Sequence, residues 1–430
     1  MATTSTTDPL EAARRSAQMV VFTTVFMDLV GFGIIIPLLP LYGQDLGAGA
    51  WTLPLLVSAY SLAQFFFAPV WGQISDRHGR RPVMLASMTG STLAYLGFAL
   101  ATWWHSLPLL LATRFLQGAS AANISTAQAC IADTTPAERR AGGMALIGIA
   151  FGIGFTFGPV IGGVSLKFLG PLAPGLIASG LCGLNLLLAR VRLPETLDAA
   201  HRAANQALPW RRYDPLNTAS LAAALRHPYL WLLLLISFLQ LAAFSTMEQV
   251  FALFFKAHLG FDTATAGLKT GYVLCYVGLL AGTFSGMLMR GKRSIVPRFG
   301  ERRLMAAGLF IFAGMLFVMP YGPSYGSYFL ILLPLSLGRS LIDPTLSSLV
   351  SQAASARDQG STFGTFQGLN SLARVLGPAL GVWMFEQDVQ LPFLAAAGVS
   401  VLVFLLSLLL LARTRGLAGV DASSVSSKLA

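Results

Sequence analysis

The stretch GQISDRHGRR, residues 72–81, lies between two long apolar segments and joins two glycines to one acid and a group of bases. A sharp turn between two membrane helices needs close backbone approach or positive φ, and Gly72 and Gly79 permit both. Asp76 can accept hydrogen bonds from arginine or from a helix N-terminus, and the bases suit the lipid headgroup layer. The stretch therefore predicts a tight turn at a membrane surface.

The composition indicates an integral membrane protein. Of 430 residues, 55% are hydrophobic and 11% are charged, whereas a soluble chain carries about 25% charged residues. Charge-poor segments of roughly the 20 residues that cross a bilayer occur twelve times. They lie near 19–41, 53–75, 82–102, 107–131, 142–166, 171–189, 229–255, 264–289, 304–321, 327–350, 363–385 and 392–412. We predict an all-α membrane protein with twelve transmembrane helices.

The spans form two sets of six, which predicts two pseudo-symmetric six-helix bundles. The expected division is a cytoplasmic N-terminal tail 1–17, a first bundle 18–192, a cytoplasmic linker 193–227, a second bundle 228–413 and a cytoplasmic C-terminal tail 414–430. The linker contains three prolines and is too short for another domain. We expect it to include a short amphipathic piece on the membrane.

The net charge of +11 follows the membrane topology rather than a nucleic-acid partner. Apart from three arginines within spans, all lysines and arginines except Lys167, Lys256 and Lys269 fall in loops on one side. Such loops face the cytoplasm, so both termini are expected there. The three cysteines fall in or beside spans and predict helix packing, with no disulfide framework or metal cluster.

The two halves repeat one pattern faintly, as in transporters built from two related bundles. Gly158, Pro159 and Gly162 in the fifth span match Gly377, Pro378 and Gly381 in the eleventh. Arg114 in the fourth span likewise matches Arg339 in the tenth. Glycine and proline are common in membrane helices, so the order of the matches carries the argument.

Three motifs resemble the major facilitator superfamily. The 72–81 stretch is similar to its loop between helices 2 and 3, although Ile74 replaces the usual leucine. Arg114, Gln117 and Gly118 resemble the fourth-helix motif, whose arginine is linked with proton coupling. The fifth-helix motif associated with antiporters is resembled by Gly148, Gly152, Gly158, Pro159 and Gly162.

The first span refines the resemblance. Its sequence DLVGFGIIIPLLP, from Asp28 to Pro40, looks like the drug/proton antiporter branch that includes tetracycline exporters and the animal tetracycline-transporter-like proteins. The resemblance implies the two-bundle fold and a packed, bent hinge at the fifth-helix glycines.

Six ionisable residues within spans should face a cavity or one another, because each costs about 2.5–3.5 kcal/mol or more at the bilayer centre. Asp28 lies roughly 14 Å from the cytoplasmic start of its helix. A desolvated carboxyl group holds its proton more tightly and a nearby arginine favours release, so Asp28 with Arg114 is the proton-coupling candidate. A permanent ion pair or helix-to-helix hydrogen bond is the alternative. The substrate-cavity candidates are Gln117, Asn123, Glu248, Gln249, Arg339, Asp343, Gln367, Asn370 and Arg374.

Two further expectations concern charge pairs. Arg339 and Asp343 are four residues apart and can pair on one helix face, so a structural role is favoured for them. The conformational-switch loop is expected to comprise Gly72, Asp76, Arg77, Gly79, Arg80, Arg81 and Asp133, and its Asp76 and Arg80 are expected to form a cytoplasmic charge network with Asp133, Glu138 and Arg139. Each exposed pair contributes about 0–1 kcal/mol, but several can bias two nearly balanced conformations.

These patterns predict a secondary transporter that exports drug-like or amphipathic molecules by proton antiport and alternating access. The expected partners are the small-molecule substrate and the lipid bilayer, for a monomer without cofactor or metal in a bacterial inner membrane. Uptake of a metabolite coupled to protons or sodium is one alternative, and a non-transporting receptor in a transporter fold is another. An enzyme is not expected, because no Gly-x-x-x-x-Gly-Lys-Ser/Thr loop or metal-ligand cluster is present.

Overall fold

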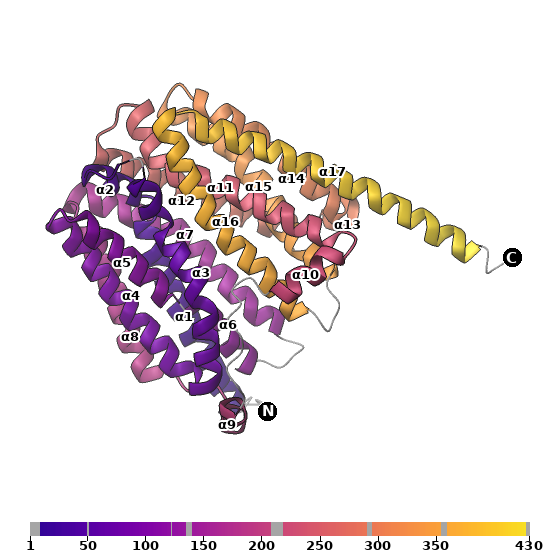
Figure 1. Ribbon diagram of the computed structural model, residues 1–430, viewed down its shortest axis with the longest axis horizontal. Helices are drawn as coiled ribbons and strands as arrows, with labels where there is room; N and C mark the ends of the chain where they lie inside the picture. The colour runs from indigo at the N-terminus through magenta and orange to yellow at the C-terminus, as the bar shows by residue number, and fades with distance from the viewer. Residues whose placement is uncertain are drawn as a thin grey trace, which may run out of the picture. The chain divides into compact units, whose positions relative to one another are not determined.

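The computed structural model describes residues 9–49, 51–121, 123–134, 140–207, 218–289, 295–353 and 359–426, and this part of the chain is helical without strands (Figure 1). Helices suit a lipid environment because they satisfy every backbone polar group within one segment. The first nine are α1 (Pro9–Ile35), α2 (Leu39–Asp45), α3 (Thr52–His78), α4 (Arg80–Trp103), α5 (Leu107–Ser120), α6 (Asn123–Thr134), α7 (Arg140–Leu169), α8 (Ala173–Arg192) and α9 (Ala199–Ala207).

In the second half of the chain, the described residues form eight α-helices and one short 3-10 helix. They are α10 (Thr218–Arg226), α11 (Leu230–His258), α12 (Thr263–Met289), α13 (Val296–Phe299), α14 (Glu301–Val318), the 3-10 helix η3 (Met319–Tyr321), α15 (Tyr325–Ala353), α16 (Gln359–Gln387) and α17 (Leu391–Ser426), the 3-10 turn being counted apart. Helix α17 continues to Ser426, so part of the expected C-terminal tail is helical.

Nine of the described helices are long and apolar enough to cross a membrane. A tenth is reached if α3, which bends by 44° between Thr52–Ala68 and Val70–His78, is counted as one span. The remaining two predicted spans correspond to α5 with α6, which are interrupted between Ser120 and Asn123, and to α16, which carries several polar residues. The all-α membrane fold is confirmed, and each predicted span coincides with helix.

The helices pack into two compact units, one of Met1–Pro215 with Gly260–Cys275 and one of Leu216–Leu259 with Tyr276–Ala430. The start of α12 therefore packs with the first unit. Within the linker, α9 packs on α3, and α10 packs on α11 and α16. The expected division of the chain into tails, bundles and linker stays a prediction.

The repeated Gly-Pro-x-x-Gly pattern makes the same helix contact in each unit. In the first unit, a Cβ added at Gly158 of α7 would lie 2.7 Å from Gly33 Cα of α1, and one at Gly162 would meet the Ile34 carbonyl. In the second unit, a Cβ at Gly377 of α16 would lie 2.5 Å from the Ala242 carbonyl oxygen of α11. The missing side chains let these helix pairs approach closely.

The 72–81 stretch is largely helical, which corrects the expectation of a ten-residue loop. Helix α3 continues to His78 and α4 begins at Arg80, so Gly79 alone makes the turn with φ 109°. Gly79 has the positive φ expected of it, but Gly72 lies inside α3 with no atom within 4 Å of an added Cβ. The turn needs one glycine because a single residue outside helical φ and ψ redirects the chain.

Candidate functional site

A pocket with a mainly apolar lining opens among α1, α3, α4 and α5 in the first unit. Its cavity volume is small, about 30 Å³. Both apolar and hydroxyl-bearing side chains line it: Asp28, Leu29, Phe32, Tyr60, Ser91, Tyr95, Gln117 and Ala121. Two residues predicted from the sequence, Asp28 and Gln117, therefore meet in one pocket.

Asp28 has a neighbour from outside its own helix. The Cys182 thiol of α8 lies 3.8 Å from Asp28 Oδ1, a distance suited to a weak S–H donor. Asp28 is also next to Leu29, which belongs to a buried apolar cluster with Val25. Cys182 is completely buried and was expected only to pack helices, whereas its thiol also contacts the candidate proton carrier.

Arg114 is buried on α5, with 1% of its surface exposed. Its Nη1 donates a hydrogen bond to Gln117 Oε1, and its guanidinium carbon lies 5.2 Å from the centre of the Tyr60 ring. Arg114 Nε is buried without a hydrogen-bond partner. A buried guanidinium is costly unless compensated, and here an aromatic face and an amide contribute.

Tyr60 and Tyr95 connect the pocket to Arg114. The Tyr60 ring lies 4.6 Å from the ring of Phe32, and both line the pocket. Tyr95 interacts electrostatically with both Asp28 and Arg114, so the two predicted members of the proton-coupling pair share a neighbour. Sequence reasoning missed both tyrosines because nothing in their local pattern separates a pocket-lining tyrosine from an apolar-core one.

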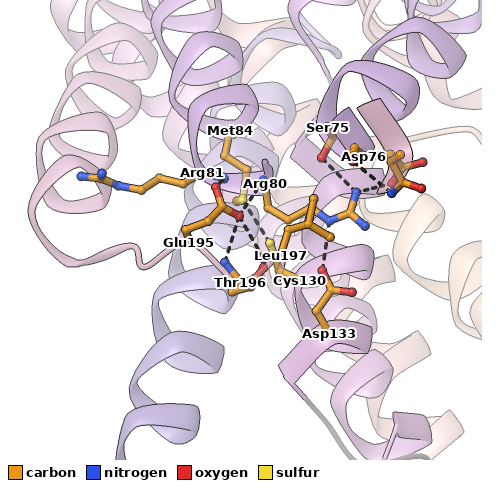
Figure 2. A network of polar contacts seen from close by, with 11 residues as sticks. Ser75, Asp76, Arg80, Arg81, Met84, Cys130, Asp133, Glu195, Thr196 and Leu197 are labelled. Carbon is orange, nitrogen blue, oxygen red and sulfur yellow. Dashed lines mark hydrogen bonds and ion pairs between the residues drawn. The ribbon is translucent and has the colours of Figure 1, made fainter. Parts of the chain in front are cut away.

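A second polar site lies at the turn between α3 and α4 (Figure 2). Arg80 Nη1 is 2.6 Å from Asp76 Oδ1 and 3.1 Å from Ser75 Oγ, and Arg80 Nε is 3.0 Å from Asp133 Oδ2 of α6. The side chain of Arg80 is 10% exposed, so these charge-assisted bonds form at a largely buried guanidinium. The predicted network of Asp76, Arg80 and Asp133 is thus present as direct contacts. Its other two predicted members, Glu138 and Arg139, lie outside the described part of the chain.

The linker completes this network, which the sequence alone did not indicate. Glu195 accepts hydrogen bonds from the backbone N–H groups of Arg80 at 2.9 Å and Arg81 at 3.3 Å (Figure 2). A carboxylate at a helix N-terminus satisfies free N–H groups and favours the helix dipole. From α9, Asn205 Nδ2 donates to the Asp76 carbonyl at 3.1 Å and Gln206 Nε2 donates to the Arg77 carbonyl at 2.8 Å.

Of the linker residues in this network, only Glu195 had a feature in the sequence that could have identified it. It follows Pro194 directly after the basic end of the sixth span, where an isolated acid is unusual. Arg81, another predicted member, donates from Nη2 to the Arg190 carbonyl at 2.8 Å, which joins the ends of α4 and α8.

The predicted hinge glycines differ from one another. Gly158 and Gly162 make the close contacts with α1, and Pro159 lies inside α7. Gly152 meets nothing within 4 Å, so its expected role in close packing is wrong. The surroundings of Gly148 and the side chain of Asn123 lie outside the described part of the chain.

Four of the predicted substrate-cavity residues gather in the second unit. Arg339 Nε lies 3.1 Å from Asp343 Oδ2, and its guanidinium carbon lies 3.4 Å from the centre of the Phe244 ring. Glu248 interacts electrostatically with Arg339 and Arg374. Elsewhere on α11, Ser237 Oγ donates to Asn370 Oδ1 at 2.8 Å.

Gln249 and Gln367 do not join this group by any described contact. Gln249 is 5% exposed and its Oε1 has no hydrogen-bond partner, while Gln367 is exposed on α16. Among the described residues, no group of three His, Cys, Asp or Glu side chains could hold a metal ion.

Comparisons with known proteins match nearly the whole chain. The Major Facilitator Superfamily profile matches residues 21–297 and 294–427. Mouse major facilitator superfamily domain-containing protein 10 is 30% identical over 93% of this chain and 93% of its own length. The class C tetracycline resistance protein of Escherichia coli is 30% identical over 85% of this chain and 88% of its length.

Among solved structures, the human organic anion transporter MFSD10 superposes with a TM-score of 0.67. It is 29% identical in sequence, and the match covers 93% of this chain and 100% of that one. The matched regions include both units and both candidate sites. The chain therefore belongs to the major facilitator superfamily of membrane transporters.

Proposed function

We propose that this chain is a proton-coupled antiporter that exports amphipathic small molecules by alternating access. The observation that carries the proposal is Asp28, a carboxylate within an apolar membrane span that lines a pocket near the buried Arg114. Acids inside a span are costly and mark proton or substrate pathways in transporters. The fifth-helix glycines resemble the antiporter motif, which favours exchange over symport.

In the proposed mechanism, Asp28 has a different environment when the pocket opens outward than when it opens inward. When the pocket opens outward, Asp28 takes a proton and becomes neutral, which removes a charge from a poorly solvated site. When it opens inward, Arg114 and the hydroxyl of Tyr95 favour the ionised carboxylate, and the proton leaves. Substrate and proton then use the same change of conformation in opposite directions, so the proton gradient drives export. No bound cofactor is needed.

The proposed substrates are amphipathic and include organic anions. Aromatic side chains line the pocket beside polar groups, a mixture of side-chain types that suits a ring system with one polar end. The names of two relatives support this choice, since one concerns tetracycline resistance and the other organic anion transport. We further propose a monomer with both termini cytoplasmic, in a bacterial inner membrane.

The proposal is tested with purified protein in proteoliposomes carrying an imposed pH gradient. A library of amphipathic acids, bases and neutral compounds is added, and substrate flux and proton flux are recorded together. Antiport predicts proton movement against substrate movement, with accumulation that collapses when the pH gradient is removed. Movement of substrate and proton in the same direction would favour uptake, and no flux of any compound would favour a receptor.

A further inference from the structure

One face of α11 presents a polar and aromatic stripe to two arginines of the second unit. Gln240, Phe244 and Glu248 are spaced four residues apart, so they lie on one helix face in successive turns. Arg339 comes from α15 and Arg374 from α16. The first unit's pocket contains none of these residues.

Arg339 is fixed against this stripe. Its guanidinium lies 3.4 Å from the centre of the Phe244 ring, within the range of a cation–π contact. Because Phe244 and Glu248 occupy successive turns, the guanidinium lies within about one turn of the Glu248 carboxylate. Its ion-pair partner Asp343 lies on the same helix and has a side chain that is 61% exposed.

Arg374 belongs to the same level of the unit. On α16, Asn370 is hydrogen-bonded to Ser237, and Gly377 packs against Ala242 and Ser245 of α11. Arg374 lies between these two contacts in sequence, which places it beside the Gln240–Phe244 turn. Glu248 interacts electrostatically with both arginines.

Gln240 adds a buried polar group without a partner. It is 5% exposed, and its Oε1 accepts no hydrogen bond. The close glycine contacts align the helices of the two units. Ala242 lies against Gly377 as Val30 lies against Gly158, and Thr246 lies against Gly381 as Ile34 lies against Gly162. By this alignment Gln240 takes the place that Asp28 has in the first unit. The second unit thus has a neutral amide at the proton-carrier position and two guanidinium groups nearby.

We propose that Arg339 and Arg374 form a subsite for the acidic group of an amphipathic anionic substrate, with Glu248 as the resident counter-ion that this group replaces. The Phe244 ring lies beside the site and can contact an aromatic part of the substrate. Two arginines within the membrane are costly without a counter-charge, and Glu248 supplies it while the site is empty. The inference rests on the proposed transport of small molecules and specifies their charge.

The test uses three isosteric probes that differ in charge: 2-naphthoate, 2-naphthamide and 2-naphthamidine. Their equilibrium binding to the purified full-length protein is measured at pH 8, where the naphthoate is ionised. The wild type should bind the anion more tightly than the amide. Glu248→Gln should strengthen naphthoate binding about tenfold and change naphthamide binding less than twofold, because a competing like charge is removed.

The controls separate charge recognition from a folding defect. Glu386→Gln makes the same substitution at the C-terminal end of α16 and should leave the binding of all three probes unchanged. Arg374→Gln and Arg339→Gln should each abolish the preference for the anion, and Arg339→Lys should restore part of it if Arg339→Gln folds poorly. Equal changes for all three probes in Glu248→Gln, or no preference for the anion in any variant, would overturn the subsite.

The outcome also separates this inference from the proposed function. Proton-driven accumulation of a neutral substrate without any preference for anions would refute the subsite and leave antiport standing. Selective binding of naphthoate without flux under a pH gradient would refute antiport and leave the subsite standing.

Discussion

Arg80 shows how much one side chain can connect. Its guanidinium contacts Asp76 and Asp133, while its backbone N–H donates to Glu195, so α3, α6 and the linker meet at one residue (Figure 2). The guanidinium is largely buried and each contact is charge-assisted. Losing one acid therefore weakens the network without removing the turn, which Gly79 makes.

Asp76→Asn should slow transport while leaving the protein folded and inserted. The substitution removes the negative charge 2.6 Å from Arg80 Nη1 but keeps an oxygen that can accept the hydrogen bond. A partly exposed pair contributes about 0–1 kcal/mol, which corresponds to at most about a fivefold shift between two balanced conformations. The measurement is the initial rate of transport at matched protein level.

Glu301→Gln is the matched control for Asp76→Asn. Glu301 begins α14 and accepts hydrogen bonds from Ser348 and Gln352, both at 2.7 Å. Neither of these partners is an arginine. Its replacement should affect the rate less. A normal rate in Asp76→Asn, or an equal loss in both variants, would contradict the role of the network.

Asp262 lies outside the predicted membrane spans, and its carboxyl group predicts that the thermal stability of the protein depends on pH. Hydrogen bonds from Thr265, followed by the charge of Lys167 at 3.5 Å, hold the pKa of the Asp262 carboxyl below its ordinary value. Because its pKa is lowered, the Asp262 carboxylate stabilises the folded protein at every pH above its ordinary pKa. This stabilisation is lost as the pH falls through the pKa in the folded protein. The Tm difference between the wild type and Asp262→Asn should be constant from pH 8 to pH 5 and shrink only in stronger acid. A difference that vanishes near pH 6 would refute this.

At the scale of single residues, the sequence predicted charge pairs between nearby residues better than it predicted contacts with side chains from other helices. Arg339 and Asp343 are four apart on α15, a spacing that brings them together within one helix, whereas Asp76 and Arg80, also four apart, meet across the turn at Gly79. The Cys182 thiol beside Asp28 and the Tyr60 ring beside Arg114 come from other helices. Such contacts depend on how helices pack and leave no spacing in the sequence.

At the scale of helices, the contact between α1 and α7 depends on the absence of a side chain at Gly158. An added Cβ would meet backbone atoms of Gly33, which cannot rotate away as a side chain can. Gly158→Ala should therefore force α7 away from α1 and cost about 1–3 kcal/mol, as overpacking does. We expect loss of turnover at retained folding, measured as flux and thermal stability on one preparation.

Gly152→Ala is the control on the same helix, because nothing lies within 4 Å of its added Cβ. It should retain wild-type flux and stability. Wild-type flux together with wild-type stability in Gly158→Ala would contradict the close contact.

The docking of α9 predicts that the linker affects the turn between α3 and α4. Asn205 and Gln206 donate to the last carbonyls of α3, which have no partners within the helix. Replacing both by alanine should lower the Tm and increase proteolysis within the linker, since each bond contributes about 0.5–1.5 kcal/mol. Replacement of the neighbouring exposed Ala203 by serine should change neither. Unchanged Tm and proteolysis in the double variant would show that α9 does not dock in solution.

At this scale, the sequence predicted where helices lie but not where they bend or dock. The twelve apolar segments follow from hydrophobicity alone, because lipid selects for length and apolar composition. The short α9 lacks that signal, and its docking depends on two side-chain amides. The turn at Gly79 was expected to occupy ten residues because polar residues usually mark loops, whereas these residues extend α3.

On the scale of the whole molecule, the two units carry different chemistry on a common plan. Each uses a Gly-Pro-x-x-Gly helix packed on its first long helix, as the repeat predicted. The first unit has Asp28 at the register position where the second has the neutral Gln240. We infer that proton exchange belongs to the first unit and recognition of substrate charge to the second, a division that the faint repeat in the sequence did not indicate.

The most direct test of proton coupling is a paired measurement on purified Asp28→Asn protein: substrate binding, and accumulation driven by a pH gradient in proteoliposomes. Asparagine keeps the shape of the neutral acid and much of its hydrogen bonding but cannot release a proton. The account predicts substrate binding within about threefold of wild type, a difference below about 0.7 kcal/mol, and no accumulation above equilibrium. Uphill, proton-driven accumulation by the Asp28→Asn variant would contradict it.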